Sequence, residues 1–274
     1  MKPVFALLTV VAAACLTAGI PTPADSWKLV WADEFNTPGK PDPANWSFEK
    51  GFVRNEEHQW YQPDNAWCEN GHLIIEARRE QKPNPNYEAG STNWKTNRQN
   101  ITYTASSLHT RGLHTWKYGR FEMRGKIDVR PGMWPAFWTL GIKGEWPSNG
   151  EIDIMEYYRN MLLANVAWAT GTRYKANWNS TKTPLSDFPV NWADKFHVWR
   201  MDWDEKEIKL FVDDRLLLTS DSQKTVNPDG THPFDQPHYI LLNLAIGGQN
   251  GGDPSGTQFP GRFEVDYVRV YQKQ

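Results

Sequence analysis

Apolar and polar residues alternate in short runs along most of this 274-residue chain, and Gly, Pro and Asn separate the runs. A period of two is typical of β-strands with one buried face, because successive side chains of a strand point to opposite sides. The runs are 27–31, 46–48, 66–77, 101–111, 118–129, 133–140, 162–170, 196–203, 207–212, 215–218, 239–246 and 263–271. The pattern predicts an all-β protein, a sandwich of two antiparallel sheets.

Turn signals and polar stretches divide these runs. Asn70-Gly71, the dipeptide most typical of a two-residue hairpin turn, lies inside the run 66–77. Segments 80–100 and 171–191 are polar and aperiodic, so we expect both to be loops. No long helical spacing and no repeat is found, and residues 25–274 are expected to form one domain.

The run 151–156 carries three carboxylates in six residues, Glu151, Asp153 and Glu156. In a regular strand Glu151 and Asp153 share one face, and Glu156 lies on the other, among apolar side chains. An unpaired carboxylate is costly there. One extra residue near Ile154, a β-bulge, returns Glu156 to the acidic face, and bulges are common beside active sites. We therefore predict a bulge in this strand.

Three carboxylates on one face repel one another, so their pKa values are expected to be forced apart. Glycoside hydrolysis needs such a difference, because one ionised carboxylate attacks the anomeric carbon while one protonated carboxyl donates to the leaving oxygen. Glu151 and Glu156 are the candidates for this pair, and Asp153 between them is placed to tune both. The spacing alone also fits a cation site made of acids, or a solvated edge strand.

The motif and its surroundings resemble glycoside hydrolase family 16, in the bulged E-x-D-x-x-E form. Residues 134–138, Trp-Pro-Ala-Phe-Trp, precede the motif. Further segments that resemble the family follow in its order: 30–35, 116–122, 196–197 and 265–271. Within the family, the chain is most similar to laminarinases and bacterial endo-β-1,3(1,4)-glucanases.

This resemblance implies a β-jelly roll whose curved sheet forms a concave, open cleft for a polysaccharide. It also implies an endo-acting, retaining glycosidase in which Glu151 is the nucleophile, Glu156 the general acid/base and Asp153 their electrostatic partner. The chemistry needs no cofactor. The expected substrate is β-1,3-glucan or mixed-linkage β-1,3/1,4-glucan.

The resemblance places further residues in the cleft. Asn55, in the polar segment 54–61, occupies a motif position that lines the cleft in the family. Trp134, Trp138 and Trp146 are expected to be sugar platforms, because a flat aromatic ring suits the apolar face of a pyranose.

Members of the family often hold a structural calcium on the convex side. Glu34, Gly71 and Asp266 occupy the places of its ligands here, and oxygen ligands suit Ca²⁺. Such an ion would stabilise the fold and take no part in catalysis.

Two alternatives stay open at this point. A galactanase of the same family, acting on agar, porphyran or carrageenan, would use the same acids, and Arg54, Arg98 and Arg111 could bind sulfate groups. A non-catalytic, lectin-like glucan-binding module is the alternative from another class. The intact pair Glu151 and Glu156 argues against it, because a lectin has no use for two opposed carboxyls.

Composition narrows the partners. The formal net charge is −2, which gives no electrostatic case for nucleic acid. Aromatic residues make up 14% of the chain, with 15 Trp, which favours a carbohydrate partner. We expect a monomer.

Residues 1–24 are expected to be an export signal and a short tether. Lys2 precedes an apolar run, Val4 to Ala14, that is too short to span a membrane. The protein is therefore predicted to be exported: secreted, periplasmic, or anchored to the cell envelope through a lipid on Cys15, since residues 11–15 resemble a bacterial lipoprotein signal. Cys68 is the other cysteine, so no disulfide is expected within the domain.

Overall fold

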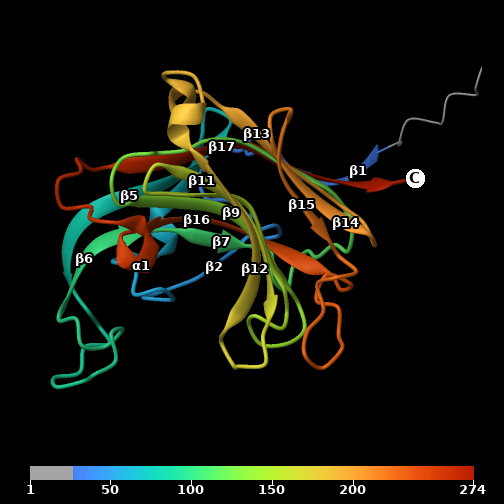
Figure 1. The fold of residues 1–274 in the computed structure, drawn as a ribbon. Coiled ribbons are helices and arrows are strands. Elements are labelled where there is room, and N and C mark those ends of the chain that lie inside the picture. Colours follow the sequence, from blue (N-terminus) through green and yellow to red (C-terminus); the bar gives the residue numbers. More distant parts are fainter. Residues whose placement is uncertain (1–26) are drawn as a thin grey trace, which may run out of the picture.

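The computed structural model describes residues 27–274, and nearly all of its regular structure is β-strand (Figure 1). Two sheets pack face to face. The outer sheet has ten strands: β1 (Trp27–Asp33), β3 (Gln59–Tyr61), β4 (Ala66–Glu69), β5 (His72–Pro83), β6 (Asn100–Ala105), β8 (Gly119–Lys126), β13 (His197–Trp203), β14 (Glu207–Val212), β15 (Arg215–Asp221) and β17 (Gly261–Lys273). The inner sheet has seven: β2 (Ser47–Phe48), β7 (Ser107–His109), β9 (Met133–Gly141), β10 (Glu151–Tyr158), β11 (Met161–Ala169), β12 (Ala176–Pro184) and β16 (His238–Ile246).

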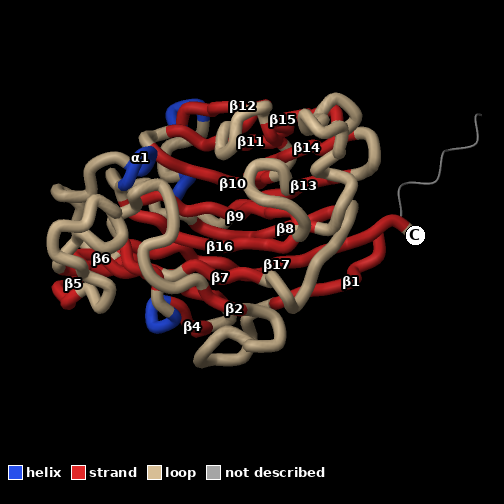
Figure 2. The backbone as a smooth tube through the Cα atoms, turned by 90° about the horizontal axis from the view of Figure 1, so that it is seen from below, coloured by secondary structure: helices blue, strands red, loops and turns tan. Residues whose placement is uncertain are grey.

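The inner sheet runs β12-β11-β10-β9-β16-β7-β2, and Figure 2 shows its strands in this order, over the strands of the outer sheet. All pairings except the short parallel pair β3–β6 are antiparallel. The helical segments are short: α1 (Gly248–Gly251) and three 3-10 turns, Pro63–Asn65, Leu185–Asp187 and Trp192–Asp194. None of the helices among residues 27–274 is long and apolar enough to cross a bilayer. The predicted sandwich of two antiparallel-rich sheets, the jelly-roll architecture, is confirmed.

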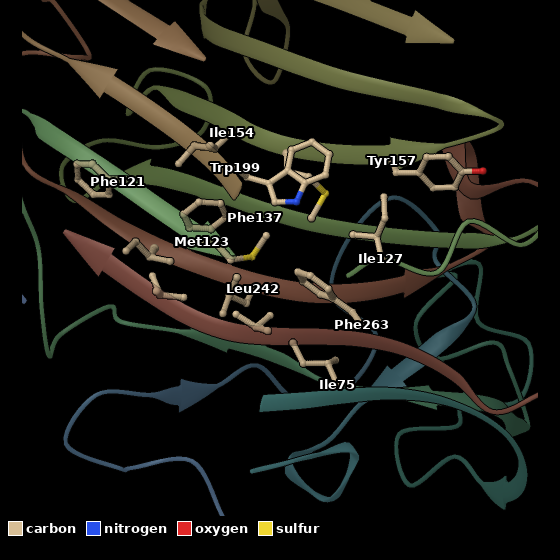
Figure 3. Close-up of a cluster of buried hydrophobic side chains, with 14 of the residues drawn as sticks. Ile75, Phe121, Met123, Ile127, Phe137, Ile154, Tyr157, Trp199, Leu242 and Phe263 are labelled. Atoms are coloured by element: carbon tan, nitrogen blue, oxygen red, sulfur yellow. The ribbon is translucent and has the colours of Figure 1, made fainter. Parts of the chain in front are cut away.

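The hydrophobic core fills the space between the two sheets. Figure 3 shows Phe121, Phe137, Leu242 and Phe263 pointing into it from β8, β9, β16 and β17, and all four are fully buried. Because alternate residues of each strand supply this core, the other face of the inner sheet is left for different side chains. That second face carries the site described below.

The predicted bulge in β10 is confirmed. Against β9, Asp153 pairs with Trp138 and Met155 with Phe137, so Ile154 is the extra residue. Ile154 and Met155 are both buried in the core, and Glu156 returns to the face of Asp153. The hairpin at Asn70-Gly71 is also confirmed, with φ of +53° and +76° at the two turn residues.

Three predictions about strands and loops were wrong in detail. Segment 171–191 is not one loop, because β12 pairs with β11 along nine residues. Segment 80–100 is a loop only between Pro83 and Asn100, since β5 continues through its first residues. The run 101–111 is two strands: the chain leaves the outer sheet after Ala105 and joins the inner sheet at Ser107.

Candidate active site

A cleft of ≈ 1300 Å³ lies across the inner sheet, on the face opposite the core. Its floor is built by alternate side chains of β9, β10, β11, β12 and β16. Its rim comes from the segments around Asn55, Trp94, Trp146 and Tyr174. The predicted substrate cleft is therefore present, and it extends to both sides of β10.

The three predicted carboxylates all line this cleft. Glu151, Asp153 and Glu156 project from the central strand β10, and Asp153 between the two glutamates is 5% exposed. The β10 bulge lies between Asp153 and Glu156, and its two apolar residues enter the core instead. The sequence thus places three acids on one face without placing any of them in the core.

Each outer carboxylate accepts a hydrogen bond from an indole N–H. Trp146 Nε1 donates to Glu151 Oε2 over 2.7 Å, and Trp134 Nε1 donates to Glu156 Oε1 over 2.7 Å. Hydrogen bonds to an ionised acceptor are the stronger kind, and they fix the orientation of the carboxylate. Both glutamates are therefore held in place before a substrate binds.

Asn165 joins the other two acids. It lies on β11 directly opposite Asp153, and its Nδ2 donates to Asp153 Oδ2 and to Glu156 Oε2, each over 2.9 Å. Asn165 was not predicted as a site residue. The signal was available, because Asn165 is a lone amide in the otherwise apolar run Leu162–Ala167.

The environment separates the protonation of the three acids. Burial, reinforced by the charges of Glu151 and Glu156, raises the pKa of Asp153 well above its usual range, so Asp153 keeps a proton and hydrogen-bonds to Glu151. Burial also raises the pKa of Glu151. Hydrogen bonds from Trp146 and Asp153, together with the positive charge of Arg54, oppose this rise. Burial raises the pKa of Glu156 to about 7. Glu151 is therefore favoured as the ionised carboxylate and Glu156 as the proton donor near neutral pH.

One arm of the cleft runs toward Asn55 and contains a buried polar network. Asn55 Nδ2 donates to Glu57 over 3.3 Å, and Gln59 Nε2 donates to the same carboxylate over 2.6 Å. Arg54 forms an ion pair with Glu49. Burial raises the pKa of Glu57, which the sequence analysis did not single out. Asn55 lies in the cleft as expected, and the substrate contact assigned to it stays a prediction.

The three Trp residues that were expected to be platforms all line the cleft, but two show little surface. Trp134 is 5% exposed and Trp138 7%. The guanidinium of Arg54 lies 5.1 Å from the Trp138 ring centroid, and Trp138 Nε1 donates to Asn243 Oδ1 over 2.7 Å. Their stacking on sugars stays a prediction, and the hydrogen bonds of Trp134 and Trp146 to the acids are an additional role.

The most exposed aromatic rings in the cleft are different ones. Tyr174 is 54% exposed and Trp178 47%, and both line the arm of the cleft over β11 and β12. Trp94 lines the opposite arm. Of the arginines considered for sulfate binding, Arg54 lines the cleft. Arg98 instead donates to the carbonyls of residues 56 and 57.

The residues expected to bind calcium do not fit such an ion as their side chains lie. Both carboxylate oxygens of Glu34 accept hydrogen bonds from Arg269, over 2.7 and 2.8 Å. Asp266 pairs with Arg124 over 2.5 Å and lies 3.8 Å from His72. No group of three His, Cys, Asp or Glu that could hold a metal is found within residues 27–274. The calcium stays a prediction, and calorimetric titration with Ca²⁺ measures it directly.

Two other reactive side chains have structural positions. Cys68 is buried and free, and burial raises the pKa of its thiol to about 11, so it does not act as a nucleophile. His197 lies outside the cleft, hydrogen-bonded to Asp213 and to the carbonyl of Trp192. Cys15 and the predicted export signal lie outside the described residues.

The fold and the paired carboxylates in an open cleft are those expected of a glycoside hydrolase. A sequence model of glycosyl hydrolases family 16 matches residues 55–269. The chain is 38% identical to a β-glucanase of Rhodothermus marinus over 269 residues, which cover 91% of this chain and 86% of that protein. The chain belongs to glycoside hydrolase family 16, and it is an endo-acting member.

Two solved structures give the same architecture. A laminarinase catalytic domain from Thermotoga petrophila RKU-1 superposes with a TM-score of 0.75 at 32% identity, covering 92% of this chain and 100% of that one. A structure of the endo-acting O-glycanases with which human gut bacteria initiate mucin breakdown gives a TM-score of 0.83 at 34% identity, covering 92% and 93%.

Proposed function

We propose that the protein is a retaining endo-β-glucanase that cleaves β-1,3-glucan or mixed-linkage β-1,3/1,4-glucan within the chain. The observation that carries the proposal is the placement of Glu151 and Glu156 on one strand of the cleft, each held by a separate indole donor. The similarity to glucanases and laminarinases supports the choice of substrate. The open cleft suits a long polymer, since glycan can extend beyond β10 on both sides.

In the first chemical step the Glu151 carboxylate attacks the anomeric carbon. Glu156 transfers its proton to the glycosidic oxygen as the bond between that oxygen and the anomeric carbon breaks. The aglycone leaves as an alcohol, and a glycosyl ester forms on Glu151. The Asp153 proton, directed at Glu151, stabilises the nucleophile while it is ionised.

In the second step Glu156, now ionised, removes a proton from water. As that proton moves to Glu156, the water oxygen attacks the anomeric carbon and the ester bond to Glu151 breaks, which leaves Glu151 ionised and Glu156 protonated. Two inversions retain the anomeric configuration. The donors Trp134 and Asn165 stabilise the Glu156 carboxylate in the interval between the steps.

The direct test is the Glu151→Gln substitution, assayed by products from laminarin, barley mixed-linkage glucan and lichenan. We expect oligosaccharides from the wild type and a loss of activity of at least 10³-fold in the variant, because the nucleophile is gone. Glu69→Gln, at an exposed position on the β4–β5 turn, is the matched control. A Glu151→Gln variant with near-wild-type turnover would overturn the assignment.

A second candidate substrate is a galactoside-containing glycan, either a galactan such as agar, porphyran or carrageenan or a mucin O-glycan. The higher TM-score of the O-glycanase structure, 0.83 against 0.75 for the laminarinase, favours it, and Arg54 in the cleft suits an oxygen-rich substituent. Agarose, carrageenan and purified mucin therefore belong in the same assay. Products from these alone would keep the mechanism and replace the substrate.

We also propose that the enzyme is exported and acts as a monomer. The sequence of residues 1–24, which resembles an export signal, supports the location, with Cys15 as the proposed lipid attachment site in the anchored form. Mass spectrometry of the mature N-terminus identifies the cleavage site and any lipid, and light scattering gives the oligomeric state.

A further inference from the structure

The strand β12 presents three side chains to the cleft: Trp178, Ser180 and Lys182. They are alternate residues, so they share one face of the strand. The register from β12 through β11 to β10, which includes the β10 bulge, places each of them in line with one acid across the sheet: Trp178 with Glu151, Ser180 with Asp153 and Lys182 with Glu156. The three side chains therefore form a row on β12 that lies alongside the row of acids on β10.

The separation between the two rows suits a neighbouring sugar unit. Paired strands lie about 4.8 Å apart, so β12 is roughly 10 Å from β10 across the sheet. On β11, between the rows, the cleft-lining side chains are Leu163 and Asn165. Leu163 is almost fully buried. It forms a floor below the level of the exposed Trp178 and Lys182, and a glycan can lie across it.

Trp178 has the properties of a sugar platform. Its side chain is 47% exposed, although it lines a cleft, and its ring has no aromatic or cationic partner among residues 27–274. By contrast, the buried Trp134 and Trp138 are engaged by polar groups on β10 and β16. Ligand clefts are lined predominantly by hydrophobic and aromatic side chains, and Trp178 is such a ring left open beside the row of acids.

Lys182 is a cation without an ion-pair partner among the residues that the structure describes. Its side chain is exposed in the cleft, in line with Glu156 across the sheet. Its charge also acts on Glu156, whose pKa it lowers against the larger effect of burial. An ammonium group donates up to three hydrogen bonds, and it binds oxygen acceptors such as a sugar hydroxyl or a sulfate ester.

We propose that Trp178, Ser180 and Lys182 form a glycan subsite on β12, in which Trp178 stacks on a sugar next to the cleaved linkage and Lys182 binds an oxygen substituent of that sugar. The inference rests on the proposed function, because it assigns a substrate contact to the same cleft. In this proposal the β12 side of the cleft, opposite the arm that contains Asn55, determines which glycan binds. Sugar hydroxyls and sulfate esters both present oxygen acceptors to Lys182, and assays on neutral and sulfated glycans distinguish between the two.

The test compares Trp178→Ala and Lys182→Met with two controls, Tyr87→Ala and Lys28→Met. Tyr87 and Lys28 are exposed residues outside the catalytic cleft. We expect KM for the polymer that the wild type cleaves to rise about tenfold in each test variant, while kcat falls less and the controls stay unchanged. Lys182→Met should in addition move the alkaline limb of the pH profile to higher pH, whereas Trp178→Ala should not.

The outcomes are distinct. A KM effect of Lys182→Met on neutral and sulfated glycans alike assigns its ligand as a hydroxyl, and an effect confined to carrageenan or sulfated mucin assigns it as sulfate. Unchanged KM in both test variants, with an active wild type, overturns the subsite and leaves the proposed function standing. An inactive wild type on every glycan overturns the proposed function itself. In that case calorimetry compares glycan binding by the Glu151→Gln form with binding by the same form carrying Trp178→Ala. Undiminished binding in the double variant overturns the subsite as well.

Discussion

At the scale of single residues, neighbours decide what three similar carboxyls do. Asp153 lies between two acids and keeps its proton, whereas Glu151 receives an indole N–H, the Asp153 proton and the field of Arg54. Glu156 lies between these extremes, with a pKa of about 7. Its donors, Trp134 and Asn165, favour the ionised form, and burial favours the protonated form.

The pH dependence of activity follows from this arrangement. In the proposed mechanism Glu156 must be protonated to cleave the bond, so kcat/KM should fall as pH rises through its pKa of about 7. Glu151 must be ionised, so activity should also fall as pH decreases through the raised pKa of Glu151. A bell-shaped profile with its alkaline limb near neutrality is expected from initial rates on soluble laminarin.

The Trp134→Phe substitution tests the assignment of that limb to Glu156. It removes the indole donor that lowers the pKa of Glu156, so the alkaline limb should move to higher pH while the acid limb stays in place. Trp138→Phe is the matched control, because its indole N–H donates to the amide oxygen of Asn243 rather than to a carboxyl. Equal movement of the limb in both variants would contradict the assignment.

At the scale of elements, the β10 bulge solves a conflict between pattern and chemistry. The sequence predicts it, because strict alternation would have buried Glu156. Register confirms that one residue, Ile154, is extra, and that Met155 fills the core position opposite Phe137. The position of the bulge could be predicted because a regular strand would bury the Glu156 carboxylate, and this is more costly than one extra residue in the strand.

Deletions in this strand test the same reasoning. Deleting Ile154 alone gives a regular strand in which Met155 faces the core and Glu156 stays in the cleft, so the fold should survive at a cost of about 1–3 kcal/mol. Deleting both Ile154 and Met155 turns Glu156 toward the core, where an unpaired carboxylate costs several kcal/mol more. Thermal unfolding of the two variants compares them. Equal stability would show that the bulge does not set the direction of Glu156.

Other elements could not be predicted from the chain, for physical reasons. β12 has a polar sequence because its cleft face carries Trp178, Ser180 and Lys182, and its strand character comes from pairing with β11 rather than from a buried face. The change of sheet at Ser106 is likewise a tertiary event, since it depends on which strands the chain pairs with before and after that residue. Asn165 required knowledge of which residue stands opposite Asp153.

At the scale of the whole molecule, the sandwich separates stability from chemistry. The core between the sheets is apolar and continuous, while the cleft face of the same inner sheet holds three half-buried or buried acids together. Their clustering favours catalysis, yet it opposes folding wherever a buried group must ionise. The molecule should therefore be more stable without one of these carboxylates under conditions in which that group is charged.

Glu156 gives this expectation a sign and a pH window. Its pKa rises from 4.5 in the unfolded chain to about 7 in the fold, so the folded state holds the proton more tightly. The resulting stabilisation is complete below the unfolded pKa and is lost as pH rises through the folded one, by an amount of order 3 kcal/mol.

Glu156→Gln removes the group that must ionise and keeps its shape. We expect its melting temperature to exceed that of the wild type at pH 8 by several degrees and to match it at pH 4. Glu88→Gln, at an exposed position outside the catalytic cleft, should show no such pH-dependent difference. A Glu156→Gln variant that is less stable than the wild type at pH 8 would mean that the donors Trp134 and Asn165 hold the charged carboxylate more strongly than burial disfavours it.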